Sequence, residues 1–224
     1  MKGSATSFKR RLLAWYRSQA RSLPWRQTRD PYRIVVSEFM LQQTQVSRVE
    51  QFYGRFLQRF PTIEVLSRAR PAAVRETWEG LGYYRRAENL HRLARTVVSE
   101  HGGVIPRDTE TLVTLPGVGR YTAGAVASFA YERRAAAVDT NVMRVLGRYF
   151  LKKVQSAGCR VQSTPQAKRI WALASRLLPM RGKTVWEFNQ ALMDLGATIC
   201  VARRPRCGIC PVRIGCRTGA SARK

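Results

Sequence analysis

Apolar side chains recur at helical intervals along almost the whole chain. Phe8, Leu12 and Tyr16 lie four residues apart, and Phe52 and Phe56 repeat that interval. Such spacing places side chains on one face of an α-helix, and the alternation typical of strands joined by hairpin turns is absent from the sequence. We therefore predict an all-α protein of about ten short helices.

Residues that start or stop helices divide this pattern into short segments. Helix breakers stand at Pro24, Pro31, Pro61, Pro71, Gly80, Gly82, Gly102, Gly103, Pro106 and 116–119. Thr62 and Asp108 are expected N-caps, because their side-chain oxygens can accept a hydrogen bond from the first helical turn. The segment 152–168 is polar and turn-rich, and the last 25 residues are expected to form a loop held by cysteines.

The chain is strongly basic. Its 224 residues include 40 Lys and Arg against 14 Asp and Glu, which gives a formal net charge of +26, and the basic residues are spread along the sequence. This distribution favours a folded surface that binds a polyanion, and Arg in particular makes forked contacts with phosphates. Biased codon usage is an alternative explanation for the excess of Arg over Lys, but it does not account for the net charge.

Membrane insertion and secretion are not indicated. The sequence contains no run of about 18 uncharged apolar residues that could form a transmembrane helix. Its N-terminal segment lacks an apolar core followed by a small-residue cleavage site, so a secretory signal is not expected. We predict a cytoplasmic protein, associated with the nucleoid in a prokaryotic cell, with no membrane partner.

Four of the five cysteines gather near the end of the chain. Cys200, Cys207, Cys210 and Cys216 are separated by six, two and five residues, which is close enough to surround one small inorganic core. Tetrahedral zinc and a 4Fe–4S cluster both fit four thiolates. A zinc ribbon usually has two separate Cys-x-x-Cys pairs and this loop has one, so the spacing favours the cluster. Cys159 is expected to be free.

The segment 115–120 reads Leu-Pro-Gly-Val-Gly-Arg and precedes a helix-like run. Two glycines around one apolar residue predict a tight turn between two helices, and the N–H groups at the start of the second helix can hold a phosphate. A plain interhelical turn is the alternative. The candidate DNA-binding residues of this hairpin are Pro116, Gly117, Val118, Gly119 and Arg120.

Two of the scarce carboxylates lie in apolar surroundings. Glu38 lies within the mostly apolar segment 34–41 (IVVSEFML), and Asp139 follows an Ala-Ala-Ala-Val run. Burial raises a carboxyl pKa, so one of the pair could stay protonated and act as an acid while the other, ionised, opposes positive charge on a sugar. Cleavage of a glycosidic bond needs such a pair. The alternatives are an N-cap for Asp139 and a buried salt bridge with an arginine for Glu38.

Taken together, these motifs resemble those of a known family. A hairpin rich in Gly and Pro, a downstream Asp and a loop with four cysteines resemble the HhH-GPD glycosylases, and within them the MutY-type adenine DNA glycosylases. The likeness covers about residues 8–217. The segments that carry it are 23–26, 37–46 (SEFMLQQTQV), 80–84, 115–124, 138–145 and 188–196.

The resemblance implies a fold, a cofactor and a partner. The expected fold has two helical lobes flanking a DNA-binding cleft: a six-helix barrel lobe with the helix-hairpin-helix over residues 30–138, and an iron–sulfur lobe over 1–29 plus 139–224 with its cluster loop at 199–217. The family binds a 4Fe–4S cluster through the four cysteines. A monomer is expected to bind double-stranded DNA that carries a mispaired or damaged base and to flip that base out of the duplex.

The resemblance also implies roles for individual residues. Glu38 matches the general acid that protonates the leaving adenine, Asp139 matches the carboxylate that stabilises the sugar cation, and Tyr121 and Asn141 match residues beside these two. Residues that match the adenine pocket or its border are Arg21, Trp25, Arg26, Leu41, Gln43 and Gln190. Gln42 and Tyr83 match residues that probe the gap and the opposite strand.

One position indicates the subclass. Endonuclease III relatives carry a Lys after the hairpin Arg and form a Schiff base, and Tyr121 stands there in this chain. A monofunctional enzyme of base excision repair that releases adenine opposite 8-oxoguanine or guanine is therefore expected. MutY-type enzymes usually continue into a C-terminal domain that reads 8-oxoguanine, whereas this sequence ends at Lys224.

Two other functions stay open from the sequence. The first is a mismatch glycosylase for T or U opposite G, or for another base such as hypoxanthine. Thymine-mismatch relatives also carry Tyr at the position of Tyr121, but they lack the Glu that Glu38 matches. The second is a non-enzymatic iron–sulfur protein that binds DNA, which would need neither Glu38 nor Asp139.

Overall fold

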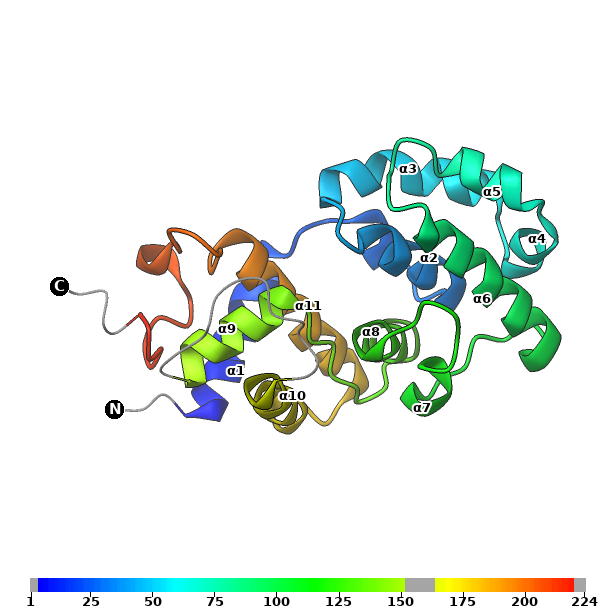
Figure 1. Ribbon diagram of the computed structural model, residues 1–224. Coiled ribbons are helices and arrows are strands. Elements are labelled where there is room, and N and C mark those ends of the chain that lie inside the picture. The colour runs from blue at the N-terminus through cyan, green and yellow to red at the C-terminus, as the bar shows by residue number, and fades with distance from the viewer. Residues whose placement is uncertain (1–3, 152–163, 220–224) are drawn as a thin grey trace. The chain divides into compact units, whose positions relative to one another are not determined.

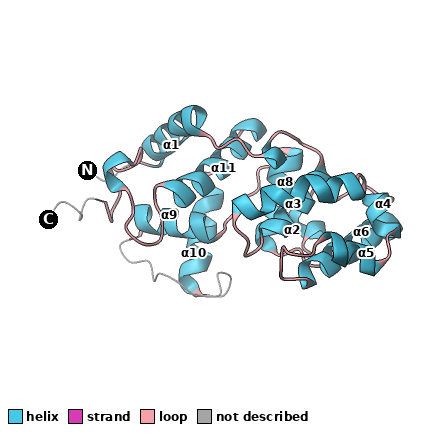
Figure 2. Cartoon of the chain, turned by 90° about the horizontal axis from the view of Figure 1, so that it is seen from above, coloured by secondary structure: helices cyan, strands magenta, loops and turns pink. Residues whose placement is uncertain are grey.

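The computed structural model describes residues 4–151 and 164–219. Throughout this part of the chain the regular structure is helical, with no strand, which confirms the predicted all-α class (Figure 2). The prediction about Cys159 and most of the turn-rich segment 152–168 lie outside the described residues. Within the described helices, none is both long and apolar enough to cross a membrane.

The described chain divides into two compact units. The first contains residues 1–21 and 134–224, and the second contains residues 22–133. The predicted domains, 30–138 and 1–29 plus 139–224, remain a prediction about the folded protein. Each unit is built around its own buried helices.

The first unit combines helices from both ends of the chain (Figure 1). Its elements are α1 (Ala5–Gln19), α9 (Thr140–Phe150), α10 (Pro165–Leu177), α11 (Gly182–Thr198) and the short 3-10 helix η2 (Cys207–Ile209). Phe8 and Leu12 of α1 are fully buried against Phe188 of α11 and Leu146 of α9. This shared core explains why apolar residues far apart in sequence keep helical spacing.

The second unit contains the remaining elements. They are η1 (Pro24–Arg26), α2 (Pro31–Leu41), α3 (Val46–Arg59), α4 (Ile63–Arg68), α5 (Pro71–Thr77), α6 (Arg85–His101), α7 (Thr109–Leu112) and α8 (Arg120–Tyr131). Helix α2 packs against α3, α6 and α8 and is therefore central to the unit. Phe56 and Trp78 meet edge to face in its core, with ring centroids 5.6 Å apart.

The predicted caps are present. Thr62 Oγ1 accepts from Val65 N (3.3 Å) at the start of α4, and Asp108 Oδ1 accepts from Thr111 N (2.7 Å) at the start of α7. Both bonds satisfy N–H groups that have no partner within their helix. The prediction of these two N-caps from sequence is confirmed.

Candidate active site and cysteine loop

Asp139 is fixed by the entry of α9, a helix of the first unit. Its Oδ1 accepts from Val142 N (2.7 Å), which makes Asp139 the N-cap of α9. Its Oδ2 accepts from Asn141 Nδ2 (2.8 Å). The N-cap reading of Asp139 is thus confirmed, and the capping bond holds the carboxylate in one orientation.

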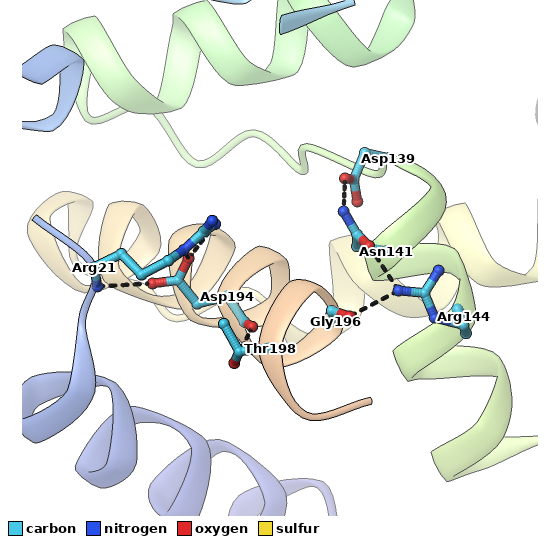
Figure 3. Close-up of polar contacts among 7 residues, drawn as sticks. All are labelled: Arg21, Asp139, Asn141, Arg144, Asp194, Gly196 and Thr198. Carbon is cyan, nitrogen blue, oxygen red and sulfur yellow. Dashed lines mark hydrogen bonds and ion pairs between the residues drawn. The ribbon is translucent and has the colours of Figure 1, made fainter. Parts of the chain in front are cut away.

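An arginine extends this pair into a network (Figure 3). Arg144 Nη2 donates to Asn141 Oδ1 (2.6 Å) and to Gly196 O in α11 (2.8 Å). Arg144 Nε donates to Cys200 O (2.7 Å), the backbone carbonyl of the first loop cysteine. A chain of polar contacts therefore runs from the carboxylate of Asp139 through Asn141 and Arg144 to the start of the cysteine loop.

Two opposing effects act on the Asp139 carboxyl. Burial raises its pKa because desolvation disfavours the charged form, and this effect prevails. The N–H of Val142, the amide of Asn141 and the charge of Arg144 lower the pKa, because each stabilises the carboxylate. Three groups thus favour the ionised form of Asp139 at a position where burial opposes ionisation.

Helices α9 and α11 approach each other closely at Gly196. A Cβ atom at this position would lie 2.6 Å from Asn141 Cβ and 3.1 Å from Asn141 Cα. We predict that Gly196→Ala lowers the free energy of unfolding by about 1–3 kcal/mol, the cost typical of overpacking. It should also displace Asn141 and so weaken its bond to Asp139. Urea denaturation measures the first effect.

Gly54 supplies the matched control for this prediction. It lies in the middle of α3, is exposed, and has no atom within 4 Å of its added Cβ. Gly54→Ala should therefore stabilise the protein by about 0.5–1 kcal/mol, because Ala loses less backbone entropy in a helix. A Gly196→Ala variant as stable as the parent would show that the two helices can separate at no cost.

Arg21 is held by a buried carboxylate in the first unit. Its Nη2 lies 2.6 Å from Asp194 Oδ1, and its Nε donates to the same oxygen at 2.7 Å. The Asp194 side chain is 1% exposed, and Thr198 Oγ1 donates to the Asp194 carbonyl (Figure 3). The predicted pocket residue Arg21 is thus anchored to α11, the helix that also carries buried Gln190.

Glu38 lies in the second unit, in the last turns of α2. It is 4% exposed, although α2 is otherwise lined by apolar residues such as Phe39 and Met40. Tyr121 is half-buried in the first turn of α8, the helix that packs against α2. An acid placed in this apolar core must be accommodated at an energetic cost, which is typical of a functional group.

The predicted hairpin joins α7 and α8, which confirms the helix-hairpin-helix. Gly117 has φ +77°, and a Cβ atom there would lie 2.7 Å from Asn89 Cβ and 2.8 Å from Phe39 Cε1. Gly119 is the N-cap of α8, and it and Arg120 are exposed. The first N–H groups of α8 therefore start a helix that no side chain caps, as an anion site requires.

The remaining predicted residues fall in the second unit. Trp25 is 7% exposed and contacts Tyr53 edge to face, whereas Tyr83 is 58% exposed. Arg26 and Leu41 are half-buried; Gln42 is half-buried and Gln43 is exposed in the turn after α2. Gln43 and Tyr83 both have left-handed backbone, with φ +58° and +49°.

Four polar residues in these networks were missed by sequence reasoning. Arg144, Asp194 and Asn189 support the first unit, and Arg86 supports the second. Asn189 Nδ2 donates to Ala135 O (2.9 Å) and Asn189 Oδ1 accepts from Ala137 N (3.3 Å), which fixes the segment leading to Asp139. Asn189 and Asp194 lie at helix positions whose spacing marks them as buried, whereas the two arginines carry no comparable signal in the sequence.

The four clustered cysteines line one pocket of the first unit. Its volume is about 370 Å³, part of it open to solvent, and Arg148, Arg213 and Gly219 complete its wall. Within the described residues, no three His, Cys, Asp or Glu side chains are placed to hold a single metal ion.

The chemistry of this pocket suits a thiolate-bound cluster. Burial raises the pKa of Cys210 to about 11 and also raises that of Cys216, so these sulfurs would stay neutral without a cation to bind them. Gly219 N donates to Cys216 Sγ (3.3 Å), and Arg148 Nη1 lies 3.6 Å from Cys200 Sγ. Hydrogen bonds to sulfur are the contacts that support an iron–sulfur cluster.

Arg148 ties the two ends of the cysteine loop together. Its Nη1 donates to Val201 O (2.7 Å) and its Nη2 to Ala202 O (2.8 Å). Its own carbonyl accepts from Thr218 Oγ1 (3.0 Å). One residue of α9 thus holds the loop at Val201 and Ala202, which follow Cys200, and at Thr218, two residues after Cys216.

Comparison with known proteins gives a consistent match. The model for "HhH-GPD superfamily base excision DNA repair protein" matches residues 36–171. The adenine DNA glycosylase of Mycolicibacterium smegmatis is 48% identical over 90% of this chain and 66% of its own length. The adenine DNA glycosylase of Rattus norvegicus is 46% identical over 95% of this chain and 42% of its own length.

A solved structure extends the likeness to the fold. A thermostable thymine-DNA glycosylase superposes with a TM-score of 0.86 at 33% identity, covering 97% of each chain. The chain spans about two thirds of the length of the Mycolicibacterium smegmatis relative and less than half of that of the Rattus norvegicus relative.

Proposed function

Because the chain belongs to the HhH-GPD superfamily of base excision DNA repair proteins, we propose that it is a DNA glycosylase that hydrolyses the N-glycosidic bond of mispaired adenine. The observation that supports this proposal most is the buried acid Glu38, in a chain 46% and 48% identical to the adenine DNA glycosylases of Rattus norvegicus and Mycolicibacterium smegmatis. The proposed partner is double-stranded DNA, which the net charge of +26 favours.

The proposed reaction divides two roles between two carboxyl groups. Glu38 donates a proton to a ring nitrogen of the adenine as the bond from the sugar to the base breaks and its electron pair leaves with the base. Asp139, held by Val142 and Asn141, stabilises the positive charge that develops on the sugar. Water then adds to the sugar carbon and loses a proton, which leaves free adenine and an abasic site.

Tyr121 limits what happens after base release. A phenol at this position cannot form the Schiff base that a Lys would form with the opened sugar. The proposed enzyme is therefore monofunctional and leaves the DNA strand intact. Strand breaks should appear only after treatment with alkali.

The hairpin and two turns are the proposed DNA contacts. The start of α8 binds a backbone phosphate through the N–H groups that follow Gly119. Tyr83 and Gln42 act at the gap left by the flipped base and on the opposite strand. The residues proposed to line the adenine pocket or its border are Arg21, Trp25, Arg26, Leu41, Gln43 and Gln190.

The proposed cofactor is a 4Fe–4S cluster bound by Cys200, Cys207, Cys210 and Cys216. When bound, the cluster would supply a rigid centre around which the loop folds. Its role is structural in this proposal, because four cysteine ligands leave no open position for substrate. Arg148, which lines the pocket, holds the loop through backbone hydrogen bonds.

Replacing one ligand tests this cofactor. Cys207→Ala should yield protein without bound iron and sulfide, and with a loop that proteases cut readily, because the loop loses its central staple. Cys159→Ser is the matched control and should retain the iron of the parent. Zinc in place of iron in the purified parent would contradict the proposal.

One observation favours a second function. This chain superposes on 97% of the thermostable thymine-DNA glycosylase structure, to which it is 33% identical. A glycosylase for T or U opposite G is therefore the alternative, and hypoxanthine is a further base that the same scaffold could take.

A panel of substrates separates these functions. Labelled duplexes carrying A opposite 8-oxoguanine, A opposite G, T or U opposite G, and hypoxanthine opposite T are assayed with and without alkali. The proposal predicts alkali-dependent breaks on the two adenine duplexes. Breaks on the T, U or hypoxanthine duplexes alone would establish the alternative, and no breaks on any duplex would leave a DNA-binding protein.

A further inference from the structure

Arg86, the second residue of α6, is a buried arginine. It is 6% exposed, and burial lowers its pKa because desolvation disfavours the charged guanidinium. Its hydrogen bonds within the described chain all go to backbone carbonyl oxygens of the second unit. A buried charge that binds only main chain determines where that main chain lies.

The carbonyls come from two separate turns. Arg86 Nη1 donates to Phe39 O (3.0 Å), Met40 O (2.6 Å) and Gln42 O at the C-terminal end of α2. These oxygens have no partner inside the helix, and a cation there also favours the helix dipole. Arg86 Nη2 donates to Gly82 O (3.0 Å) and, weakly, to Leu81 O (3.5 Å) in the turn before α6.

Each of these turns contains a residue with left-handed backbone. Gln43 has φ +58° and follows the bonded carbonyl of Gln42; Tyr83 has φ +49° and follows that of Gly82. Residues other than glycine seldom adopt this conformation unless the surroundings impose it, and such residues gather at functional sites. Arg86 also lies 5.3 Å from the centre of the Tyr83 ring.

Both left-handed residues present their side chains to solvent. Tyr83 is 58% exposed and Gln43 is exposed, although the arginine beneath them is buried. Arg48 of α3 supports the second turn from its other side, with Nη2 donating to Gly80 O (2.7 Å). An exposed aromatic ring and an exposed amide thus stand on main chain that is fixed from below.

We propose that Arg86 is a positioning residue that joins the turn of Gln42 and Gln43 to the turn of Tyr83 and makes them one rigid probe for a stacked base step of duplex DNA. This inference rests on the proposed glycosylase function. The probe acts when the target base leaves the stack, the step that costs unstacking energy. Arg suits this place because its planar fork reaches carbonyls on both sides, which the single ammonium of Lys cannot do.

The test compares two substrates with one enzyme preparation. The first is a duplex with a single adenine mismatch, and the second carries another mispair beside it, which reduces the cost of unstacking. Arg86→Lys should lower the single-turnover rate of adenine release roughly 10- to 100-fold on the first duplex, as expected for misplaced contacts. On the second duplex the loss should be several-fold smaller.

The ratio between substrates separates positioning from folding. A variant that is merely less folded loses the same factor on both duplexes, so an equal loss would overturn the proposal, as would no loss on either. Arg55→Lys is the matched control, because Arg55 bonds only within its own helix, to Gln51 O (3.1 Å). It should behave as the parent on both substrates.

A second variant, Arg48→Lys, keeps the proposal testable if Arg86→Lys does not fold. Arg48→Lys removes the forked support of the Gly80 carbonyl, together with contacts to Gln51 and Phe52 inside α3, and should give the same substrate dependence with a smaller loss. If both Lys variants lose equally on the two duplexes, the proposal is wrong. If the parent releases adenine from neither duplex, it is the glycosylase function itself that fails, and the two failures are thus distinguishable.

Discussion

Glu38→Gln is expected to abolish adenine release while the protein still binds its DNA. Gln has nearly the same shape as the buried Glu38 but carries no proton that it can give to the leaving base. Loss of a general acid typically costs about 10²- to 10⁴-fold in rate. Single-turnover release of free base and a titration of DNA binding, made on the same preparation, measure the two properties separately.

An exposed glutamate provides the control. Glu88→Gln removes a carboxylate from the surface of the same unit, where it lies 3.7 Å from Arg75 and both side chains are largely exposed. Surface pairs of this kind contribute little, so release by Glu88→Gln should equal that of the parent. Normal turnover by Glu38→Gln would assign the acid to another group.

Asp139→Asn is expected to separate the catalytic charge from the helix cap. Asn is as good an N-cap as Asp, so the bond from Val142 N should survive and α9 should keep its start. The negative charge that opposes the sugar cation is lost, and release should fall about 10²- to 10³-fold, the scale of one electrostatic group aimed at transition-state charge. Asp139→Ala should lose the same activity and also about 1 kcal/mol of stability through the missing cap.

The pH dependence of stability gives this prediction a second readout. The folded protein raises the pKa of Asp139 above its ordinary value of 3.8, so between the two values the folded state binds more protons than the unfolded state. Stability contributed by this group is complete below 3.8 and is lost as pH rises through the raised pKa. Asp139→Asn should remove that loss, and an unchanged pH profile would contradict the assigned burial.

Much of the fold could be predicted from local sequence. Phe8 and Leu12 keep helical spacing because one face of α1 is buried. Thr62 and Asp108 mark the starts of helices because their side-chain oxygens can accept a hydrogen bond from the first helical turn. The hairpin follows in the same way, since Gly117 is required by both its φ of +77° and its close neighbours. Each of these features has a signal within a few adjacent residues of the sequence, although the contacts of Gly117 with Asn89 and Phe39 appear only in the fold.

The supporting networks could not be predicted in this way. Arg86 reaches carbonyls of α2, more than 40 residues away, and Arg144 reaches Gly196 and Cys200. In a chain with 40 basic residues, nothing in the sequence separates buried Arg86 and half-buried Arg144 from the arginines on the surface. Only the packing of the helices shows which charges face backbone carbonyls instead of water.

Identifying the released base tests the proposed activity most directly. A duplex with adenine opposite 8-oxoguanine and one with thymine opposite guanine are incubated with excess enzyme. The free bases are then separated by chromatography and identified by mass spectrometry. We expect free adenine from the first duplex with the parent enzyme, none from that duplex with the Glu38→Gln variant, and no free thymine from the second duplex. Free thymine without free adenine would contradict it and would place this chain among the thymine-mismatch glycosylases.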